Sequence, residues 1–424
     1  MGKCDSSESL FLFQKILNAY LCLLSKLQMI FDANITITGS KSETNRLLLL
    51  QALSKHAFEI ENLSNSKDSQ VMQRGLASDQ TEVNIGIAGT AMRFLTAYFS
   101  VQKGRQTLLT GEGRMLERPI GILVDALRRL GVTITYEANE GFPPILIQGT
   151  DIQIDTVTIP ANISSQYITA LMLIAPFTQK GLTIQLEGKI TSVPYIKMTL
   201  QLLQRVGVEC SFSGATIQVK PSKLLSEKQV VESDWSSASY YYALMSMGEG
   251  EIRLQSFRSD SLQGDKQLVE IYKQLGVASS FNDNQLTLSR IKDFQKPDFL
   301  TLDLNQTPDI AQTIAVNCFA LQIKCKLLGL ETLKIKETDR LAALQQELTK
   351  FGAAVEITDN SLEIKSFGEP QANIEVKTYH DHRMAMAFAP LLLKYSFTIE
   401  NPAVVEKSYP DFWEDMKKVG VDLS

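Results

Sequence analysis

The residues of this chain best suited to chemistry are basic side chains placed where helices are expected to begin. Lys41 and Arg46 lie at one such helix start, Arg93 at a second, and His382 and Arg383 at another. Free backbone N–H groups and the positive end of the helix dipole already favour an anion at these positions. Cations there destabilise the unliganded protein unless an anionic ligand is bound. The pattern therefore predicts a binding site for anionic small molecules.

A simpler interpretation of the same helix starts stays open. Ser, Thr, Asp and Asn in the first turn are common N-caps, which only satisfy free backbone N–H groups. Two expected loops, however, add more basic residues, since GEGRMLERPIG contains Arg114 and Arg118 and IKETDR contains Lys336 and Arg340. This repeated placement of cations favours the anion-binding interpretation.

Other chemical motifs in the chain are incomplete. The GSKS segment lacks the G-x-x-x-x-G-K-[ST] pattern of a phosphate loop, because Ser40 separates Gly39 from Lys41. His380–His382 could bind a metal, but the sequence shows no third ligand beside them, so we predict no metal site. No G-x-S-x-G nucleophile motif occurs.

The elements that must position these residues form an internal repeat. Five amphipathic helical runs end in a basic last turn followed by glycine, a helix stop signal. These glycines are Gly131, Gly207, Gly276, Gly352 and Gly420. A second pattern, in which a strand leads through a polar loop to an apolar helix, occurs six times. Its last four copies match at positions 72 residues apart: Ser165, Ser237, Asp309 and Asp381.

These repeats predict an α/β (α+β) fold of six units of about 70 residues, each of which mixes strands and helices. Six units divide naturally into two domains of three, with a junction near the polar segment Leu224–Ser233. We expect residues 39–232 to form the first domain and residues 29–38 plus 233–424 the second. Residues 1–28, with the Leu-rich segment Leu10–Leu24, are expected to form an amphipathic extension outside the fold.

Composition narrows the class of protein. The 424 residues carry a formal net charge of -5, and 44% are hydrophobic, which argues against general disorder, nucleic-acid binding and a polybasic membrane protein. The Leu-rich segment is too short and too polar to span a membrane comfortably. The five cysteines are scattered, so a disulfide framework is not expected and a reduced cytoplasmic location fits best.

Ten motifs, in order along the chain, resemble those of the 5-enolpyruvylshikimate-3-phosphate synthase family of enolpyruvyl transferases. The motifs are GSKSETNR, AGTAMRF, GEGRMLERPIG, SSQYITAL, PYIKMTL, SLQGD, TPDIAQTIA, IKETDRLAAL, HDHRMAMAFA and EKSYPDFW. The resemblance covers residues 35–413 and implies a two-domain inside-out α/β barrel with three βαβαββ-type units in each domain. It also implies transfer of the enolpyruvyl group of phosphoenolpyruvate to the 5-hydroxyl of shikimate 3-phosphate.

The resemblance further implies which residues bind the two anionic substrates. Those expected to bind shikimate 3-phosphate are Lys41, Ser42, Arg46, Ser164, Ser165, Gln166, Ser192, Tyr195, Asp309 and Lys336. Those expected to bind phosphoenolpyruvate are Lys41, Gly89, Arg118, Gln166, Arg340, Arg383 and Lys407. No cofactor is expected, and the protein is expected to act as a monomer without nucleic-acid or membrane partners.

Three residues are implied in catalysis: Asp309, Glu337 and Lys41. Asp309 would accept the proton of the attacking hydroxyl, with Lys336 beside it. Glu337 would protonate the methylene carbon of phosphoenolpyruvate, which requires a partly protonated carboxyl that a water-excluding cleft could favour.

Four positions depart from the family pattern, namely Ile87, Phe94, Thr332 and Val193, and they leave substrate affinity and glyphosate sensitivity open. One alternative is the UDP-N-acetylglucosamine enolpyruvyl transferase, which shares the fold and the second substrate. That enzyme has Asn after its first lysine and a reactive loop cysteine, whereas Ser42 follows Lys41 here and no cysteine lies between Cys22 and Cys210. The other alternative is a non-catalytic anion-binding relative.

Overall fold

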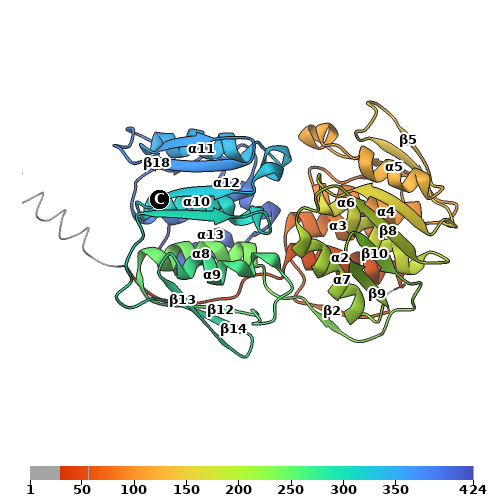
Figure 1. The fold of residues 1–424 in the computed structure, drawn as a ribbon, viewed down its shortest axis with the longest axis horizontal. Coiled ribbons are helices and arrows are strands. Elements are labelled where there is room, and N and C mark those ends of the chain that lie inside the picture. The colour runs from red at the N-terminus through yellow and green to blue at the C-terminus, as the bar shows by residue number, and fades with distance from the viewer. Residues whose placement is uncertain (1–28, 56, 424) are drawn as a thin grey trace, which may run out of the picture.

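The computed structural model describes residues 29–55 and 57–423, so the extension predicted for residues 1–28, including Leu10–Leu24, lies outside the described residues. Figure 1 shows two lobes side by side, each with sheets and helices. The mixed α/β class predicted from the repeat is confirmed. No helix in the described part of the chain is long and apolar enough to cross a membrane.

Four of the sheets have the same topology, in which a parallel pair of strands is extended by two antiparallel strands. Their strand orders are β3 (Glu82–Asn84)–β4 (Gln106–Thr110)–β6 (Ile145–Gln148)–β5 (Thr133–Tyr136); β7 (Thr156–Pro160)–β8 (Leu182–Glu187)–β10 (Thr216–Val219)–β9 (Cys210–Ser213); β1 (Ile30–Ile35)–β12 (Glu249–Gln255)–β14 (Gln285–Arg290)–β13 (Val277–Asn282); and β15 (Phe299–Asp303)–β16 (Lys324–Leu328)–β18 (Ser361–Ser366)–β17 (Ala354–Ile357). Two further sheets are shorter than the repeat predicts and hold only one parallel pair each. They are β11 (Gln229–Val230)–β2 (Ile60–Glu61) and β19 (Glu375–Val376)–β20 (Thr398–Ile399).

The helices lie in both lobes, and five of them end at the predicted stop glycines. They are α2 (Lys41–Leu53), α3 (Lys67–Ala77), α4 (Gly89–Ser100), α5 (Gly121–Arg129), α6 (Ser165–Ile174), α7 (Val193–Arg205), α8 (Trp235–Met247), α9 (Leu268–Lys273), α10 (Ala311–Ala320), α11 (Arg340–Lys350), α12 (His382–Phe388) and α13 (Phe412–Lys418). The five predicted stop glycines follow α5, α7, α9, α11 and α13, with φ between 81° and 93°. This left-handed conformation favours glycine, so the predicted helix ends are confirmed.

The buried apolar side chains form two clusters, one in each lobe. The cluster of the first lobe runs from Leu47 to Val231. The cluster of the second lobe combines Phe31–Ile37 with residues between Trp235 and Val421. In the first lobe α2, α4 and α6 contact one another, and in the second α10 contacts both α8 and α12. Most of these helices are buried on nearly every side, which is why their sequences are apolar all round.

Two chain segments join the lobes, and they lie against each other. Gly39 and Ser233 form an isolated antiparallel bridge, and the Ser40 N–H donates to the Glu232 carbonyl over 2.7 Å. A Cβ at Gly39 would lie 1.8 Å from the Asn62 carbonyl oxygen, so this crossing admits only glycine. Because β1 pairs with β12, the first lobe is inserted in the chain between two parts of the second.

Candidate active site

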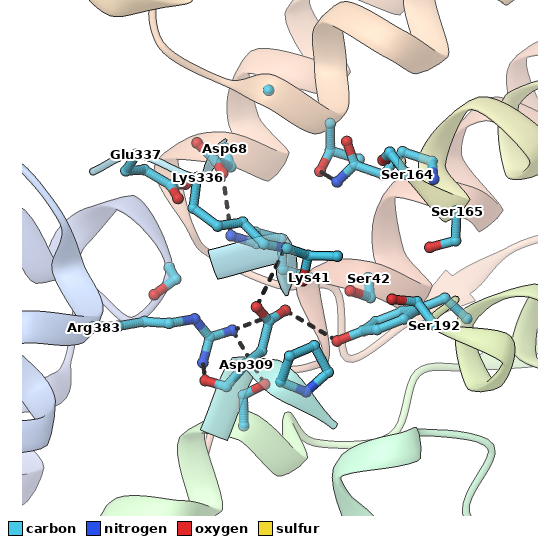
Figure 2. A pocket seen from close by; sticks show the side chains of 18 of the residues that line it. Lys41, Ser42, Asp68, Ser164, Ser165, Ser192, Asp309, Lys336, Glu337 and Arg383 are labelled. Atoms are coloured by element: carbon cyan, nitrogen blue, oxygen red, sulfur yellow. Dashed lines mark hydrogen bonds and ion pairs between the residues drawn. The ribbon is translucent and has the colours of Figure 1, made fainter. Parts of the chain in front are cut away.

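A cavity between the lobes is lined by residues at the starts of several helices. Its lining includes Lys41 and Ser42 of α2, Gly89 and Thr90 of α4, Ser165 and Gln166 of α6, Ser236 and Ser237 of α8, Asp309 just before α10, and His382 and Arg383 of α12. The predicted site residues line this cavity, with Lys407 as the exception. Figure 2 shows how the labelled side chains from both lobes meet there.

Gly89 and Arg118 approach each other closely at the start of α4. A Cβ at position 89 would lie 2.4 Å from the Arg118 Nη1, so glycine is what lets the guanidinium lie over the helix end. The buried Nε of Arg118 has no hydrogen-bond partner within the described residues. A guanidinium with a free donor, next to a helix N-terminus, is suited to a carboxylate or phosphate.

Asp309 lies among cations from three segments. Its carboxylate accepts hydrogen bonds from the Tyr195 hydroxyl (3.0 Å) and from the Arg340 Nη1 (3.1 Å). Lys336 lies 3.5 Å and Arg383 3.7 Å from its oxygens. Burial would raise the pKa of Asp309, but Lys336, Arg383 and Arg340 outweigh burial and hold that pKa well below its usual value. The carboxylate is therefore ionised and able to accept a proton.

Glu337 occupies a similar basic environment on the other side of Arg340. Arg340 Nη2 lies 3.1 Å and the Lys407 Nζ 2.9 Å from its two oxygens. Burial raises the pKa of Glu337, but Lys407, Arg340 and Arg118 together hold it well below its usual value. Nearby cations therefore dominate over burial and keep Glu337 ionised in this state of the protein, and its partial protonation in a closed, water-excluding cleft stays a prediction.

Arg340 connects three carboxylates, of which sequence reasoning identified only two as site residues. Besides Asp309 and Glu337 it binds Asp381, whose oxygen lies 2.7 Å from the Arg340 Nε. Asp381 is fully buried and caps α12 by accepting from the Arg383 N–H. A second missed carboxylate is Asp68 of α3, 3.1 Å from the Lys41 Nζ. The sequence signals at Asp381 were its matched position in the repeat and its place in the HDHRMAMAFA motif.

In the first lobe, polar groups from α2, α6 and α7 and from the residues just before them lie at the cavity wall. The Arg46 Nε donates to the Thr199 hydroxyl over 2.8 Å, and its Nη1 donates to the Ser42 carbonyl over 2.7 Å. Burial lowers the pKa of Arg46 to about 10, which still leaves it charged. Ser164 caps α6, and Ser192 precedes α7 in a left-handed conformation with φ of 53°.

Not all of the residues singled out in the sequence line the main cavity. Lys407 reaches Glu337 but lines an adjoining cavity, together with the half-exposed Ile87. Arg114 and Val193 are not among the residues that line the main cavity, whereas Phe94 and Thr332 are. His382 is buried, and burial with the nearby Lys41 holds its pKa well below the usual value, so the ring is neutral. Among the described residues no group of three or more His, Cys, Asp or Glu is arranged to hold a metal ion.

Comparison with known proteins places this architecture in a family. Residues 73–416 match the family model of EPSP synthase (3-phosphoshikimate 1-carboxyvinyltransferase). The chain is 43% identical over 397 residues to a 3-phosphoshikimate 1-carboxyvinyltransferase of Bacteroides fragilis, covering 92% of this chain and 96% of the relative. A protein of the same name from Vibrio atlanticus is 34% identical over 420 residues, covering 92% and 97% of the two chains.

Solved structures agree with this relationship at the level of the fold. An EPSP synthase structure from Acinetobacter baumannii superposes with a TM-score of 0.73 at 19% identity, covering 93% of this chain and 96% of the other. The enolpyruvyl transferase NikO from Streptomyces tendae gives a TM-score of 0.67 at 15% identity, covering 93% and 96%. From the family match and the near full-length relatives, we conclude that the chain belongs to the EPSP synthase (3-phosphoshikimate 1-carboxyvinyltransferase) family.

Proposed function

We propose that this protein transfers the enolpyruvyl group of phosphoenolpyruvate to the 5-hydroxyl of shikimate 3-phosphate and releases phosphate, a step of the shikimate pathway to aromatic amino acids. The observation that carries this function is the pairing of Asp309 and Glu337 across Arg340 in a basic cavity between two lobes. Asp309 is placed to accept a proton, and Glu337 is placed to donate a proton and take it back. The cations around them suit the two anionic substrates.

The first lobe and Asp309 would hold the acceptor substrate. The groups assigned to shikimate 3-phosphate are Lys41, Ser42, Arg46, Ser164, Ser165, Gln166, Ser192, Tyr195, Asp309 and Lys336. Hydroxyls and helix N-termini suit the ring hydroxyls and the 3-phosphate. The groups assigned to phosphoenolpyruvate are Lys41, Gly89, Arg118, Gln166, Arg340, Arg383 and Lys407. Guanidinium groups suit its carboxylate and phosphate.

The reaction then proceeds by addition and elimination. Asp309 takes the proton of the 5-hydroxyl, whose oxygen attacks C2 of phosphoenolpyruvate while C3 gains a proton from Glu337. Lys41 lines the same cavity and would stabilise the charge that develops on the phosphate of the tetrahedral intermediate. Loss of a proton from C3 back to Glu337, together with departure of phosphate, restores the double bond and yields the enolpyruvyl ether.

Glu337 must carry a proton to act as the acid, and the substrate supplies the means. The cations that hold its pKa low include Lys407, Arg340 and Arg118, which are the groups assigned to phosphoenolpyruvate. Once the carboxylate and phosphate of the substrate neutralise these cations, the remaining effect of burial raises the proton affinity of Glu337. The acid is thus formed by substrate binding rather than stored in the unliganded protein.

We also propose that the chain is divided into two domains. The first domain would comprise residues 39–232 and the second residues 29–38 plus 233–424, each an inside-out α/β barrel of three units that closes over the cavity. Two hydrophobic clusters, mutually packed inner helices and two adjacent crossing segments support this division. A cytoplasmic monomer is proposed because Cys210, Cys318 and Cys325 are free and one chain supplies both carboxylates and the surrounding cations.

Phosphate release in the presence of phosphoenolpyruvate and each candidate acceptor tests the function. We expect turnover with shikimate 3-phosphate and none with UDP-N-acetylglucosamine. Turnover with the nucleotide sugar alone would assign the alternative transferase activity. Binding of both shikimate-pathway substrates without turnover would identify a non-catalytic anion-binding relative.

A further inference from the structure

Asp265 is a buried carboxylate that lies behind the cavity rather than in its lining. It belongs to the 3-10 helix η3 (Gly264–Gln267) of the second lobe, and 5% of its surface is exposed. One oxygen accepts a hydrogen bond from the Ser236 hydroxyl and the other from the Thr307 hydroxyl. Each of these hydroxyls leads to a separate part of the proposed active site.

The Ser236 hydroxyl has one hydrogen, and its direction determines what Arg383 can bind. When that hydrogen points to Asp265, a lone pair of the same oxygen faces the Arg383 Nη2, 3.2 Å away. The Nη1 of Arg383 donates to the backbone carbonyl of Asp309 over 2.8 Å. The guanidinium is therefore fixed at both ends, and one end depends on an acceptor that Asp265 orients.

The second hydroxyl anchors the segment that carries the proposed base. Thr307 is fully buried and precedes Asp309 by two residues, just before the 3-10 helix η4 (Pro308–Ile310). Its hydroxyl donates to the other oxygen of Asp265. A single carboxylate thus holds Arg383 through Ser236 and the Asp309 segment through Thr307.

We propose that Asp265 is a positioning residue for enolpyruvyl transfer, which orients the Ser236 and Thr307 hydroxyls and thereby fixes Arg383 and the Asp309 segment. The inference rests on the function proposed above. It adds a residue that has no predicted contact with either substrate and acts only through its two hydroxyl partners. Asp265 differs in this from the buried Asp381, which binds Arg340, a residue assigned to phosphoenolpyruvate, directly.

The charges that face Asp265 predict a pH dependence. Burial and the nearby Asp309 raise the pKa of Asp265 to about 6, while the two hydroxyls and Arg383 oppose that rise. Tyr195 also faces it from α7, and burial with Asp309 holds the pKa of this phenol well above its usual value, so it stays neutral. Above pH 6 Asp265 accepts from both hydroxyls, whereas below pH 6 its proton occupies one oxygen and forces one hydroxyl to turn.

The decisive variant is D265N, which keeps the size of the side chain but removes the charge and one acceptor. We expect kcat/KM for phosphoenolpyruvate to fall roughly 10- to 100-fold, as when a hydrogen bond to a charged group is lost. Binding of shikimate 3-phosphate alone, measured by calorimetry, should weaken less than kcat/KM for phosphoenolpyruvate falls, because Arg46 and the first-lobe hydroxyls do not contact Asp265. The wild-type loss of kcat/KM below pH 6 should be smaller in D265N. Titration of the substrate phosphate near pH 6 affects both proteins equally.

D415N is the matched control, since Asp415 is also a buried aspartate that accepts from a hydroxyl, the Tyr409 hydroxyl at 2.6 Å. It does not line the cavity, and its variant should lower thermal stability without changing the KM for phosphoenolpyruvate. If D265N behaves like D415N, or retains kcat/KM within twofold of wild type, the proposal is wrong.

S236A and T307V each remove one hydrogen-bond partner of Asp265, so they test the two contacts separately. They also test the proposal if D265N does not fold. S236A removes the acceptor of Arg383 and should raise the KM for phosphoenolpyruvate, whereas T307V loosens the Asp309 segment and should mainly lower kcat. Unchanged kinetics in both variants would overturn the inference. Failure of the proposed function gives a different result, because the wild-type protein would then show no turnover with shikimate 3-phosphate.

Discussion

A carboxyl at the crossing of the two lobes should make the protein less stable as pH rises. Glu43, in the first turn of α2, is fully buried beside the crossing segment that contains Glu232. Its Oε2 accepts only the Glu232 N–H, at 3.4 Å, and its Oε1 has no hydrogen-bond partner among the residues described. Burial and Glu232 raise the pKa of Glu43 from 4.5 to about 7, against opposing effects from Arg258 and Arg205.

The magnitude follows from the linkage between protonation and folding. Below pH 4.5 both the folded and unfolded chains carry this proton, and above pH 7 neither does. Between these values only the folded protein is protonated at Glu43, so its stability falls as pH rises. At about 1.4 kcal/mol per pKa unit, the loss across this window is about 3 kcal/mol. E43Q keeps the shape of the side chain without its charge, so it should be up to about 3 kcal/mol more stable than wild type at pH 8.

Urea unfolding of wild type and E43Q at pH 5 and pH 8 measures this difference. Trp235 is a suitable fluorescent reporter, because its indole N–H donates to Glu232 at the same crossing. Far-UV circular dichroism should give the same midpoints. E347Q is a matched control, since Glu347 is equally buried but is paired with Lys350, and its replacement should destabilise the protein at both pH values.

The reasoning would be refuted if E43Q were no more stable than wild type at pH 8. A gain of equal size at pH 5 and pH 8 would also refute it, because the effect would then arise from packing rather than from ionisation. E43Q should also keep the two crossing segments in their native arrangement. Its phosphate-release activity at pH 8 should therefore match that of wild type.

Three further predictions concern the site itself. Asp309→Ala and Glu337→Ala should each lower kcat roughly 10²- to 10⁴-fold, and near-normal turnover in either variant would remove that residue from its assigned role. Gly89→Ala should raise the KM for phosphoenolpyruvate by about tenfold or more, because the added Cβ would lie 2.4 Å from the Arg118 Nη1; an unchanged KM would show that Arg118 can move freely. Adding both substrates should reduce the radius of gyration in small-angle scattering, since the cavity is lined from both lobes; unchanged scattering at saturating substrate would contradict closure.

The repeat made much of the fold predictable. Stop glycines at the ends of α5, α7, α9, α11 and α13 and the hairpins that follow four of them were visible in sequence, because both signals are local. The two short sheets were not predicted. Their paired strands, such as Ile60–Glu61 with Gln229–Val230, are too short to show an alternating pattern and are held by long-range pairing.

Motifs identified most of the cavity lining but not its electrostatics. Lys41 and Asp68 are 27 residues apart, and Arg340 and Asp381 are 41 apart, so no local pattern indicates that they pair. The ionisation of Glu337 depends on Lys407, which lies 70 residues away in sequence. These contacts require the packed lobes, and for that reason the sequence did not show that cations keep Glu337 ionised in the unliganded protein.

Because the first lobe is inserted between β1 and β12, these two paired strands of the second lobe are synthesised at different times. Ile30 pairs with Glu249, so β1 leaves the ribosome long before its partner strand has been made. At about 5 to 20 residues per second the delay is roughly 10 to 45 s. The whole first lobe can fold during that time, while Phe31, Ala33 and Ile35, which end in the hydrophobic core, have no sheet to join. The second lobe is therefore the last to form, and β1 is the segment that a chaperone or a misfolding event would encounter first.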